Sequence, residues 1–145
     1  MLKTMTPEQV RLVQDSFKKV APIAELAAEL FYGRLFHLDP ELRPLFKGDI
    51  RRQGQMLMQT LALAVRGLHQ PERIAPAVQA LGERHTGYGV RPENYDTVGE
   101  ALLWALEQGL ASSFTDEVRD AWAAAYGLLA GIMIEAAAQA AKRVA

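Results

Sequence analysis

The chain has 145 residues and no cysteine; 50% of its residues are hydrophobic, 23% are charged, and its net charge is −1. These values suit one domain with a sizeable apolar core, and they exclude disulfides, thiolate metal sites and cysteine nucleophiles. The balanced charge offers no basic surface, so we expect no nucleic-acid partner. We expect a single domain over residues 1–145.

Neither end of the chain shows a membrane or secretion signal. The segment Met1–Pro7 lacks the apolar core of a signal peptide. The longest apolar run, Ala121 to Ile134, is interrupted by Glu135 and is too short to cross a bilayer, which predicts a buried helix. We therefore expect a cytoplasmic protein without a membrane partner.

The first half of the chain predicts four helices. Thr6 and Gln9 form a capping-box pattern around Pro7, which predicts a helix with an apolar stripe to Val20. A second helix is expected from Pro22 to about His37, with its buried faces marked by Ile23, Leu26 and Leu30 and by Tyr32, Leu35 and Phe36. A short helix from Pro40 to about Phe46, a turn at 47–49 and a helix over 50–69 follow, the last closed by Pro71.

The second half predicts three more helices. Ile74, Val78, Leu81 and His85 are spaced as one line on a helix face, and the glycines at 87 and 89 end that helix. A long helix is expected from residues 91–92, with a shared face of Tyr95, Val98, Leu102 and Ala105. The last begins near Thr115 and has a core stripe of Val118, Trp122, Ala125, Leu129 and Ile132.

The pattern as a whole is all-α, with about seven helices joined by short connections and no strand signal. His85 is the residue of most interest, because a rigid imidazole on an apolar stripe can present one nitrogen to a metal. The same position also suits an ordinary core histidine that is hydrogen-bonded to a backbone carbonyl. The stripe alone leaves both interpretations open.

The spacing of Tyr32, Pro40, Phe46 and the later His85 resembles that of the globins. The resemblance runs from Thr6 to about Ala138. Further stretches are similar to bacterial single-domain globins and to the globin domains of flavohaemoglobins: Phe31-Tyr32, Gln53 with Leu57, Tyr88-Gly89-Val90, Tyr95, Ala121-Trp122 and Tyr126-Gly127. The resemblance implies a globin fold of about seven to eight helices that enclose a haem pocket.

The cofactor implied by this resemblance is haem b, with His85 as the iron ligand. The other ring N–H of His85 would donate to a backbone carbonyl, that of Leu81 by position. Phe46 would press its ring on the porphyrin, and Leu57 would limit the pocket. The full set of residues expected to bind the cofactor is Phe46, Leu57, Leu81, Arg84, His85, Val90, Tyr95 and Val98. For Arg84, which could pair with a haem propionate, solvated surface charge is an equal alternative.

Tyr32 and Gln53 are the candidate catalytic residues of the same resemblance. Their O–H and N–H groups would donate to oxygen on the side of the iron opposite His85. Each also has an ordinary explanation, Tyr32 as a half-buried core residue and Gln53 as a solvated helix residue. Gln53 stands where many globins have a second histidine, so we expect an iron with His85 as its only strong protein ligand.

One position departs from the flavohaemoglobin pattern. There, a Tyr and a Glu lie near the axial histidine and push electron density to iron. Tyr95 matches the Tyr, whereas Ala137 stands where the Glu is expected. Glu135 is two residues away, which is about 200° around a helix, so either the helix is locally displaced or the electron push is missing. The departure puts peroxidase-like and strongly oxygen-activating chemistry in doubt.

Three functions are compatible with these residues. The first is reversible oxygen binding at a pentacoordinate iron. The second is nitric oxide dioxygenase activity, which would detoxify nitric oxide and require electrons from an external reductase; whether the chain is an enzyme is left open. The third is a haem-free globin-like sensor or interaction module. The expected partners are oxygen, nitric oxide or other diatomic ligands and such a reductase, in a monomer or homodimer.

Overall fold

A computed structural model of the chain describes residues 5–46, 48–87 and 89–144, with the side chain of residue 144 excluded. Lys47, expected in a turn, and Tyr88, part of the globin resemblance, lie outside the described residues. The described residues form helices and contain no strand, which confirms the all-α prediction. The α-helices are α1 (Pro7–Val20), α2 (Ala24–Leu38), α3 (Ile50–Arg66), α4 (Pro71–Gly87), α5 (Asn94–Leu110) and α6 (Asp116–Val144), and 3₁₀ turns span Ala21–Ile23, Pro40–Leu45 and Ala111–Ser113.

Side chains cap the first turns of α1 and α3, and the cap at Thr6 is the one that the sequence predicts. The backbone N–H of Gln9 donates to Thr6 Oγ1 over 3.1 Å, and the Thr6 N–H donates to Gln9 Oε1 over 3.1 Å. This reciprocal pair satisfies two donors that the first turn of a helix leaves open. At α3, the Asp49 carboxylate accepts from the Arg51 N–H at 3.0 Å.

Several expected boundaries are wrong by a few residues. A 3₁₀ turn containing Pro22 delays α2 to Ala24. The helix over 50–69 ends at Arg66, where Gly67 caps it, and Pro71 begins α4, as its missing N–H allows. The α5 helix begins at Asn94, after a turn in which the Asn94 Oδ1 accepts from the Arg91 N–H at 2.8 Å.

The expected buried edge of α2 is only partly correct. Tyr32 and Leu35 are buried, whereas Leu26 is 49% exposed. Helix periodicity shows which residues share a face, but the width of the buried face depends on the neighbouring helices. The α2 helix packs mainly on α5 and to a lesser extent on α3, and Leu26 lies outside both contacts.

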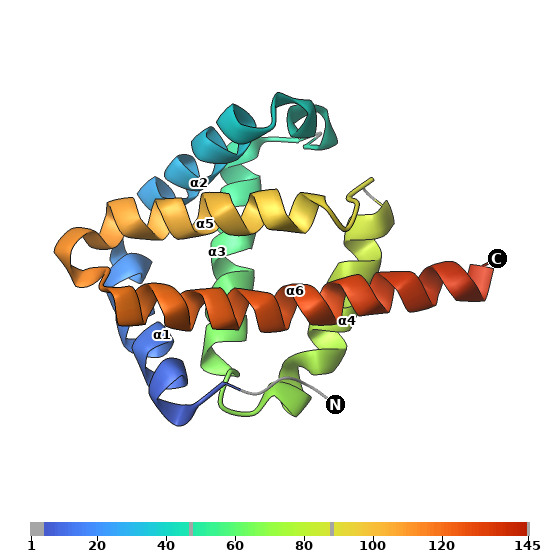
Figure 1. The fold of residues 1–145 in the computed structure, drawn as a ribbon. Helices are drawn as coiled ribbons and strands as arrows, with labels where there is room; N and C mark the ends of the chain where they lie inside the picture. Colours follow the sequence, from blue (N-terminus) through green and yellow to red (C-terminus); the bar gives the residue numbers. More distant parts are fainter. Residues whose placement is uncertain (1–4, 47, 88, 145) are drawn as a thin grey trace.

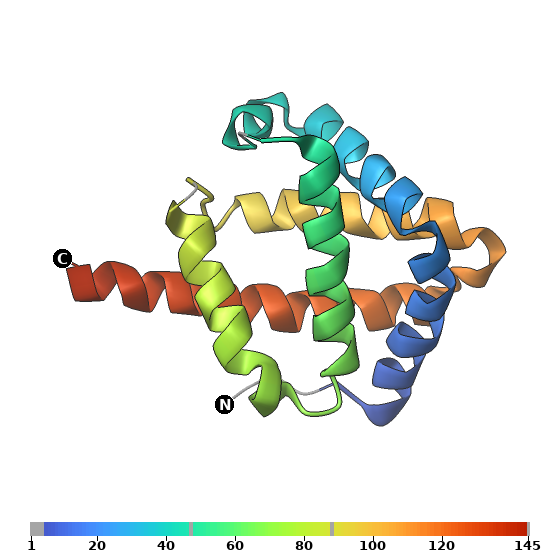
Figure 2. The same ribbon diagram turned by 180° about the vertical axis from the view of Figure 1, so that it is seen from behind.

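The helices form two crossing groups. The antiparallel pair α5 and α6 lies on one side, and α3 and α4 cross behind it (Figure 1). From behind, α3 and α4 run side by side with separated backbones (Figure 2). Among the described residues, α4 packs mainly on α6, and α3 packs mainly on α2 and α1. The spacing between α3 and α4 is therefore set by their other neighbours.

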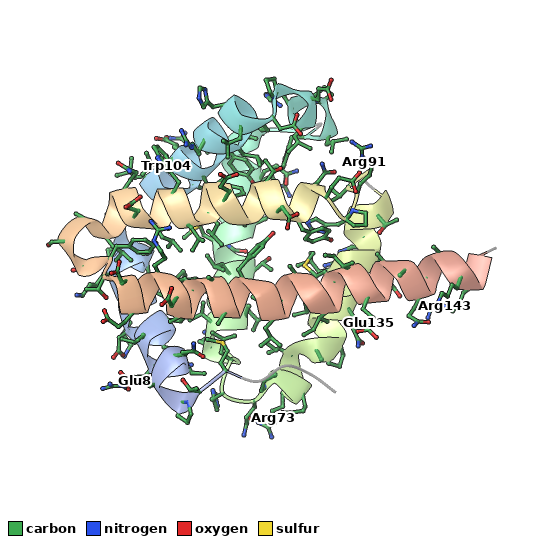
Figure 3. The ribbon with its side chains drawn as sticks, in the orientation of Figure 1. Glu8, Arg73, Arg91, Trp104, Glu135 and Arg143 are labelled. Carbon is green, nitrogen blue, oxygen red and sulfur yellow. The ribbon has the colours of Figure 1, made fainter. Side chains whose placement is uncertain are left out.

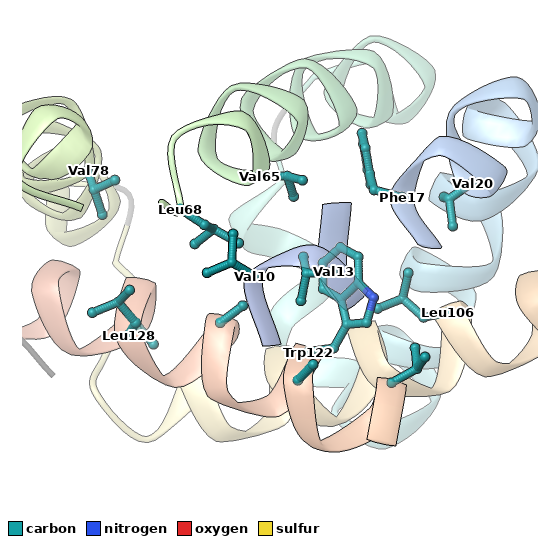
Figure 4. Packing of buried hydrophobic residues seen from close by; sticks show 14 of the residues in the cluster. Val10, Val13, Phe17, Val20, Val65, Leu68, Val78, Leu106, Trp122 and Leu128 are labelled. Atoms are coloured by element: carbon teal, nitrogen blue, oxygen red, sulfur yellow. The ribbon is translucent and has the colours of Figure 1, made fainter. Parts of the chain in front are cut away.

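The main core lies where α1 meets α6. Trp122 is 1% exposed and packs among the valines of the α1 stripe (Figure 4). Its indole Nε1 donates to Ser16 Oγ over 2.9 Å, and the Ser16 hydroxyl donates to the Leu12 carbonyl over 2.7 Å. This chain of bonds satisfies the polar end of a large buried aromatic side chain.

The α6 helix is longer and more apolar than the short run noted in the sequence. Over Asp116–Arg143 its length and composition would allow it to cross a membrane, with a hydropathy of 1.5 in its most apolar window. Only 39% of that window is buried, yet the helix packs on α1, α4 and α5. The core helix of a soluble protein passes the same test, so this feature is weak support for a membrane location.

Replacing Ser16 with alanine tests the Trp122 bond. Ser16→Ala leaves a buried indole N–H without its acceptor, which costs about 1–3 kcal/mol of unfolding free energy. Urea unfolding followed by tryptophan fluorescence measures this loss. Ser112→Ala, at an exposed serine, serves as the control and should change stability by less than about 0.5 kcal/mol. Equal stability of the two variants would contradict the assigned role of Ser16.

Candidate functional site

His85 lies in the last turns of α4, on the stripe that the sequence predicts. Val78 is buried on this stripe, and Ile74 and Leu81 pack half-buried against the same core. The Nδ1–H of His85 donates to the carbonyl oxygen of Leu81 over 2.8 Å. This bond fixes the tautomer in which Nε2 carries the lone pair, and it holds the ring against its own helix.

Partial burial favours the neutral form of the His85 imidazole. Desolvation lowers the pKa of His85 below its ordinary value, opposed by the Leu81 hydrogen bond and assisted by the neighbouring Arg84 charge. A neutral imidazole is the form that binds a metal ion. A lowered pKa means that the folded state binds the proton less readily than the unfolded state does. The contribution of His85 to the free energy of unfolding therefore falls as pH drops through the ordinary pKa of about 6.5.

The position of α4 is set by a glycine. A Cβ built on Gly82 would lie 2.5 Å from the backbone oxygen of Met133 in α6. No larger residue fits there unless the helices separate, so the two backbones touch directly. Gly82 is one turn before His85, and the contact therefore fixes where the imidazole lies relative to α6.

Tyr32 belongs to a group of aromatic side chains at the other end of the candidate site. Its ring centroid lies 5.3 Å from that of Phe46 and 6.0 Å from that of Phe36. Burial raises the pKa of Tyr32 to about 12, so the phenol stays protonated and can donate. Within the described residues, the Tyr32 hydroxyl forms no hydrogen bond.

Gln53 and Leu57 lie one turn apart on α3, and both are half-buried. The α3 helix approaches α2 closely at the next residue, because a Cβ on Gly54 would lie 2.9 Å from the Ala28 Cβ. The side-chain amide of Gln53 forms no hydrogen bond within the described residues. Tyr32 and Gln53 thus present two polar groups from two helices in close contact.

The remaining predicted cofactor residues fall into two apolar clusters. Phe46, Leu57 and Val98 pack in the cluster of Tyr32, and Leu81, Val90 and Tyr95 belong to the cluster that includes α4. The predicted apolar residues therefore fall into two clusters, and Leu102 of α5 packs against both.

Arg84 and Glu135 are both at the protein surface, which agrees with the alternative of a solvated surface charge for Arg84. Arg84 is exposed, one residue before His85. Glu135 is exposed on α6 (Figure 3), whereas Ala137 is half-buried. Glu135 therefore faces away from the side on which residue 137 lies, and no local displacement of α6 brings its carboxylate inward.

Two features of the site were not recognised in the sequence. One is the set of interior glycines, of which Gly54 and Gly82 permit close helix approach; an isolated glycine inside a helical pattern was the available signal. The other is the contact of Tyr126 with Tyr95: the Tyr126 hydroxyl donates to the backbone carbonyl of Tyr95 over 2.5 Å. Nothing in the spacing of Tyr95 and Tyr126 indicates this contact, which depends on how α5 crosses α6.

Comparison with known proteins supports the globin resemblance. The Globin family matches residues 29–133. The flavohemoprotein of Bordetella parapertussis is 37% identical over 134 residues, which cover 90% of this chain and 33% of the relative. The flavohemoprotein of Rhizobium meliloti is 35% identical over 128 residues, or 83% of this chain and 32% of the relative. The chain thus spans about a third of the length of these relatives.

Two solved structures share the fold. A bacterial globin from Campylobacter jejuni superposes with a TM-score of 0.83 at 24% identity, over 94% of this chain and 99% of that one. An engineered carbene transferase, derived from a candidate nitric oxide dioxygenase of Rhodothermus marinus, has a TM-score of 0.88 at 26% identity, over 97% and 99% of the two chains. With the family match extending over most of its length and relatives above 30% identity, the chain is a member of the globin family.

Proposed function

We propose that this globin binds haem b with His85 as the iron ligand and takes up oxygen on the Tyr32 side. The observation that carries the proposal is the His85–Leu81 hydrogen bond, which holds a half-buried imidazole in the tautomer that ligates through Nε2. Within the described residues there is no group of three or more metal-ligating side chains. A single histidine suits a metal whose other ligands come from a prosthetic group.

The apolar character of the predicted cofactor residues supports a large and mainly apolar group in this proposal. Leu57, Leu81, Val90 and Val98 are half-buried apolar residues on different elements. Phe46 offers an aromatic ring at the end of the 3₁₀ turn, and exposed Arg84 offers a cation for a carboxylate at the solvent edge. An apolar pocket with a charged edge matches the amphipathic character of haem.

When bound, haem supplies an iron at which oxygen binds and reacts with nitric oxide. Tyr32 and Gln53 supply hydrogen bonds to the partial negative charge that oxygen acquires there. The Tyr32 ring packs against the rings of Phe36 and Phe46, whereas the longer Gln53 side chain has more rotatable bonds. In the proposal, Tyr32 is therefore the stronger of the two donors.

We further propose nitric oxide dioxygenase activity with an external reductase. Nitric oxide, oxygen and one electron together give nitrate, so each turnover needs an electron that this chain's side chains do not provide. The support is the similarity to flavohemoproteins and to a structure derived from a candidate nitric oxide dioxygenase. Ala137 and the exposed Glu135 leave His85 without a nearby carboxylate from α6 at these positions, which weakens electron donation to the metal.

Removing the proposed ligand tests haem binding. His85→Ala should abolish tight binding of added haemin or leave a complex whose spectrum shifts when imidazole is added, because the imidazole nitrogen is lost. Absorption titration near 400–420 nm, roughly the Soret range of haem, measures this.

His37→Ala, at an exposed histidine that ends α2, is the matched control and should bind haem as wild type does. An unchanged spectrum of His85→Ala would refute the ligand assignment. Purified wild-type protein that takes up no haem would instead support a haem-free sensor or interaction module.

The two polar residues should differ in their effect on oxygen release. Tyr32→Phe removes a rigid hydrogen bond to a partly charged group, worth about 1.5–3 kcal/mol, so oxygen should dissociate roughly one to two decades faster. Gln53→Leu should have a smaller effect, because the flexible amide can turn to solvent. Stopped-flow displacement of oxygen by carbon monoxide measures both rates. Equal rates in wild type and Tyr32→Phe would eliminate the proposed donor.

Mixing the oxygenated protein with nitric oxide tests the enzymatic proposal. One equivalent of nitrate should form rapidly without a reductase, and repeated turnover should require an added flavin reductase with a nicotinamide donor. Nitrate analysis after stopped-flow mixing measures both. If nitric oxide simply replaces oxygen and no nitrate appears, reversible oxygen binding remains as the function.

A further inference from the structure

A groove separate from the His85 region lies between α2 and α3. It has a volume of about 640 Å³, which falls within the range of roughly 300–1,000 Å³ found for small-molecule sites. Of the residues predicted for the candidate site, the groove is lined by Tyr32 alone. The sequence contains no signal for this groove, because it forms where two separate helices cross.

The floor of the groove is made of small or apolar groups. Ala28, Tyr32 and Gly54 are buried residues that line it. A Cβ on Gly54 would lie 2.9 Å from the Ala28 Cβ and 3.8 Å from the Tyr32 ring. The charged side chains are at the exposed rim, where Arg51 of α3 pairs with Glu25 of α2 at 2.7 Å. Such an exposed ion pair contributes about 0–1 kcal/mol and does not hold the groove closed.

Tyr32 is common to the groove and to the candidate site. Its ring lines the groove, and the same ring packs against Phe46, 5.3 Å between centroids, in the inner aromatic cluster. The Tyr32 ring therefore lies between the groove and the region where the proposed donors meet. Passage along this route therefore requires a transient movement of the packed Tyr32 ring.

We propose that this groove is the access route by which small uncharged molecules, such as dioxygen and nitric oxide, reach the inner side of Tyr32. The inference rests on the proposed haem function, because the haem is where these molecules would bind. The route itself is inferred from the groove. Neutral diatomics need no polar partner, and an apolar floor favours them over ions and over water.

Two glycines allow a matched test. Gly33 lines the groove, and a Cβ built on it meets no atom within 4 Å. Gly33→Trp therefore places a large ring at the groove without a clash at its first carbon. Gly127 in α6 is likewise exposed with no atom within 4 Å of an added Cβ, and α6 contributes no residue to the groove lining. Gly127→Trp is the control.

The first measurement is carbon monoxide binding to the reduced haem protein after flash photolysis. A narrower groove raises the same free-energy barrier for entry and for exit of carbon monoxide. Gly33→Trp should therefore slow association about threefold or more and slow dissociation by the same factor. The affinity should stay unchanged, and Gly127→Trp should match wild type. Unchanged association in Gly33→Trp would overturn the proposal, and so would an altered affinity, which would indicate a disturbed Tyr32.

The second measurement needs no haem. Dissolved dioxygen is paramagnetic and speeds the NMR relaxation of nearby protons. The Ala28 methyl group, on the groove floor, should relax faster in oxygenated buffer than the Ala27 methyl group, which is equally buried on α2 but packs in the main core. Gly33→Trp should remove the difference.

Equal relaxation of the two methyl groups in wild type would contradict the groove as a path for dioxygen. If the protein binds no haem, the proposed function fails, and the relaxation measurement still decides whether dioxygen occupies the groove. The failures of the two proposals are thereby distinguished.

Discussion

The direct contact of α4 with α6 at Gly82 is the constraint on which the candidate site depends. A Cβ built on Gly82 would lie only 2.5 Å from the Met133 backbone oxygen, so there is no room for a side chain between the two backbones. His85 follows one turn later, so its distance from α6 is set by backbone contact, and its hydrogen bond to Leu81 sets the ring orientation. Position and orientation of the imidazole thus come from two local and rigid interactions.

The opposite side of the site is held by an equivalent contact between other helices. Gly54 brings α3 onto Ala28 of α2, and Tyr32 lies one turn from Ala28 on the same helix. In the described residues, α3 and α4 each pack mainly on other helices. Their separation is consequently fixed from outside, by two glycine crossings.

The sequence predicted the helices and their stripes well, because periodicity and capping are local properties. The Thr6 cap, the α1 stripe and the carbonyl partner of His85 are confirmed. The exposed Leu26, the 3₁₀ turn at Pro22 and the role of Gly82 were not predicted, because each depends on how closely another helix approaches. The globin resemblance assigned Tyr32 and Phe46 to the same pocket, but their direct contact was not predicted, because a single sequence contains no spatial information to derive it.

The Tyr32 side of the site has more polar side-chain groups available than the His85 side, and this difference bears on the proposed chemistry. On the Tyr32 side, a protonated phenol and an amide remain without partners among the described residues. On the His85 side, the imidazole is oriented by a neutral carbonyl, and Glu135 points to solvent. A carbonyl acceptor increases the basicity of an imidazole less than a carboxylate does. In the proposed function, this arrangement favours holding oxygen over cleaving it, and nitric oxide would supply the reactivity that converts the held oxygen to nitrate.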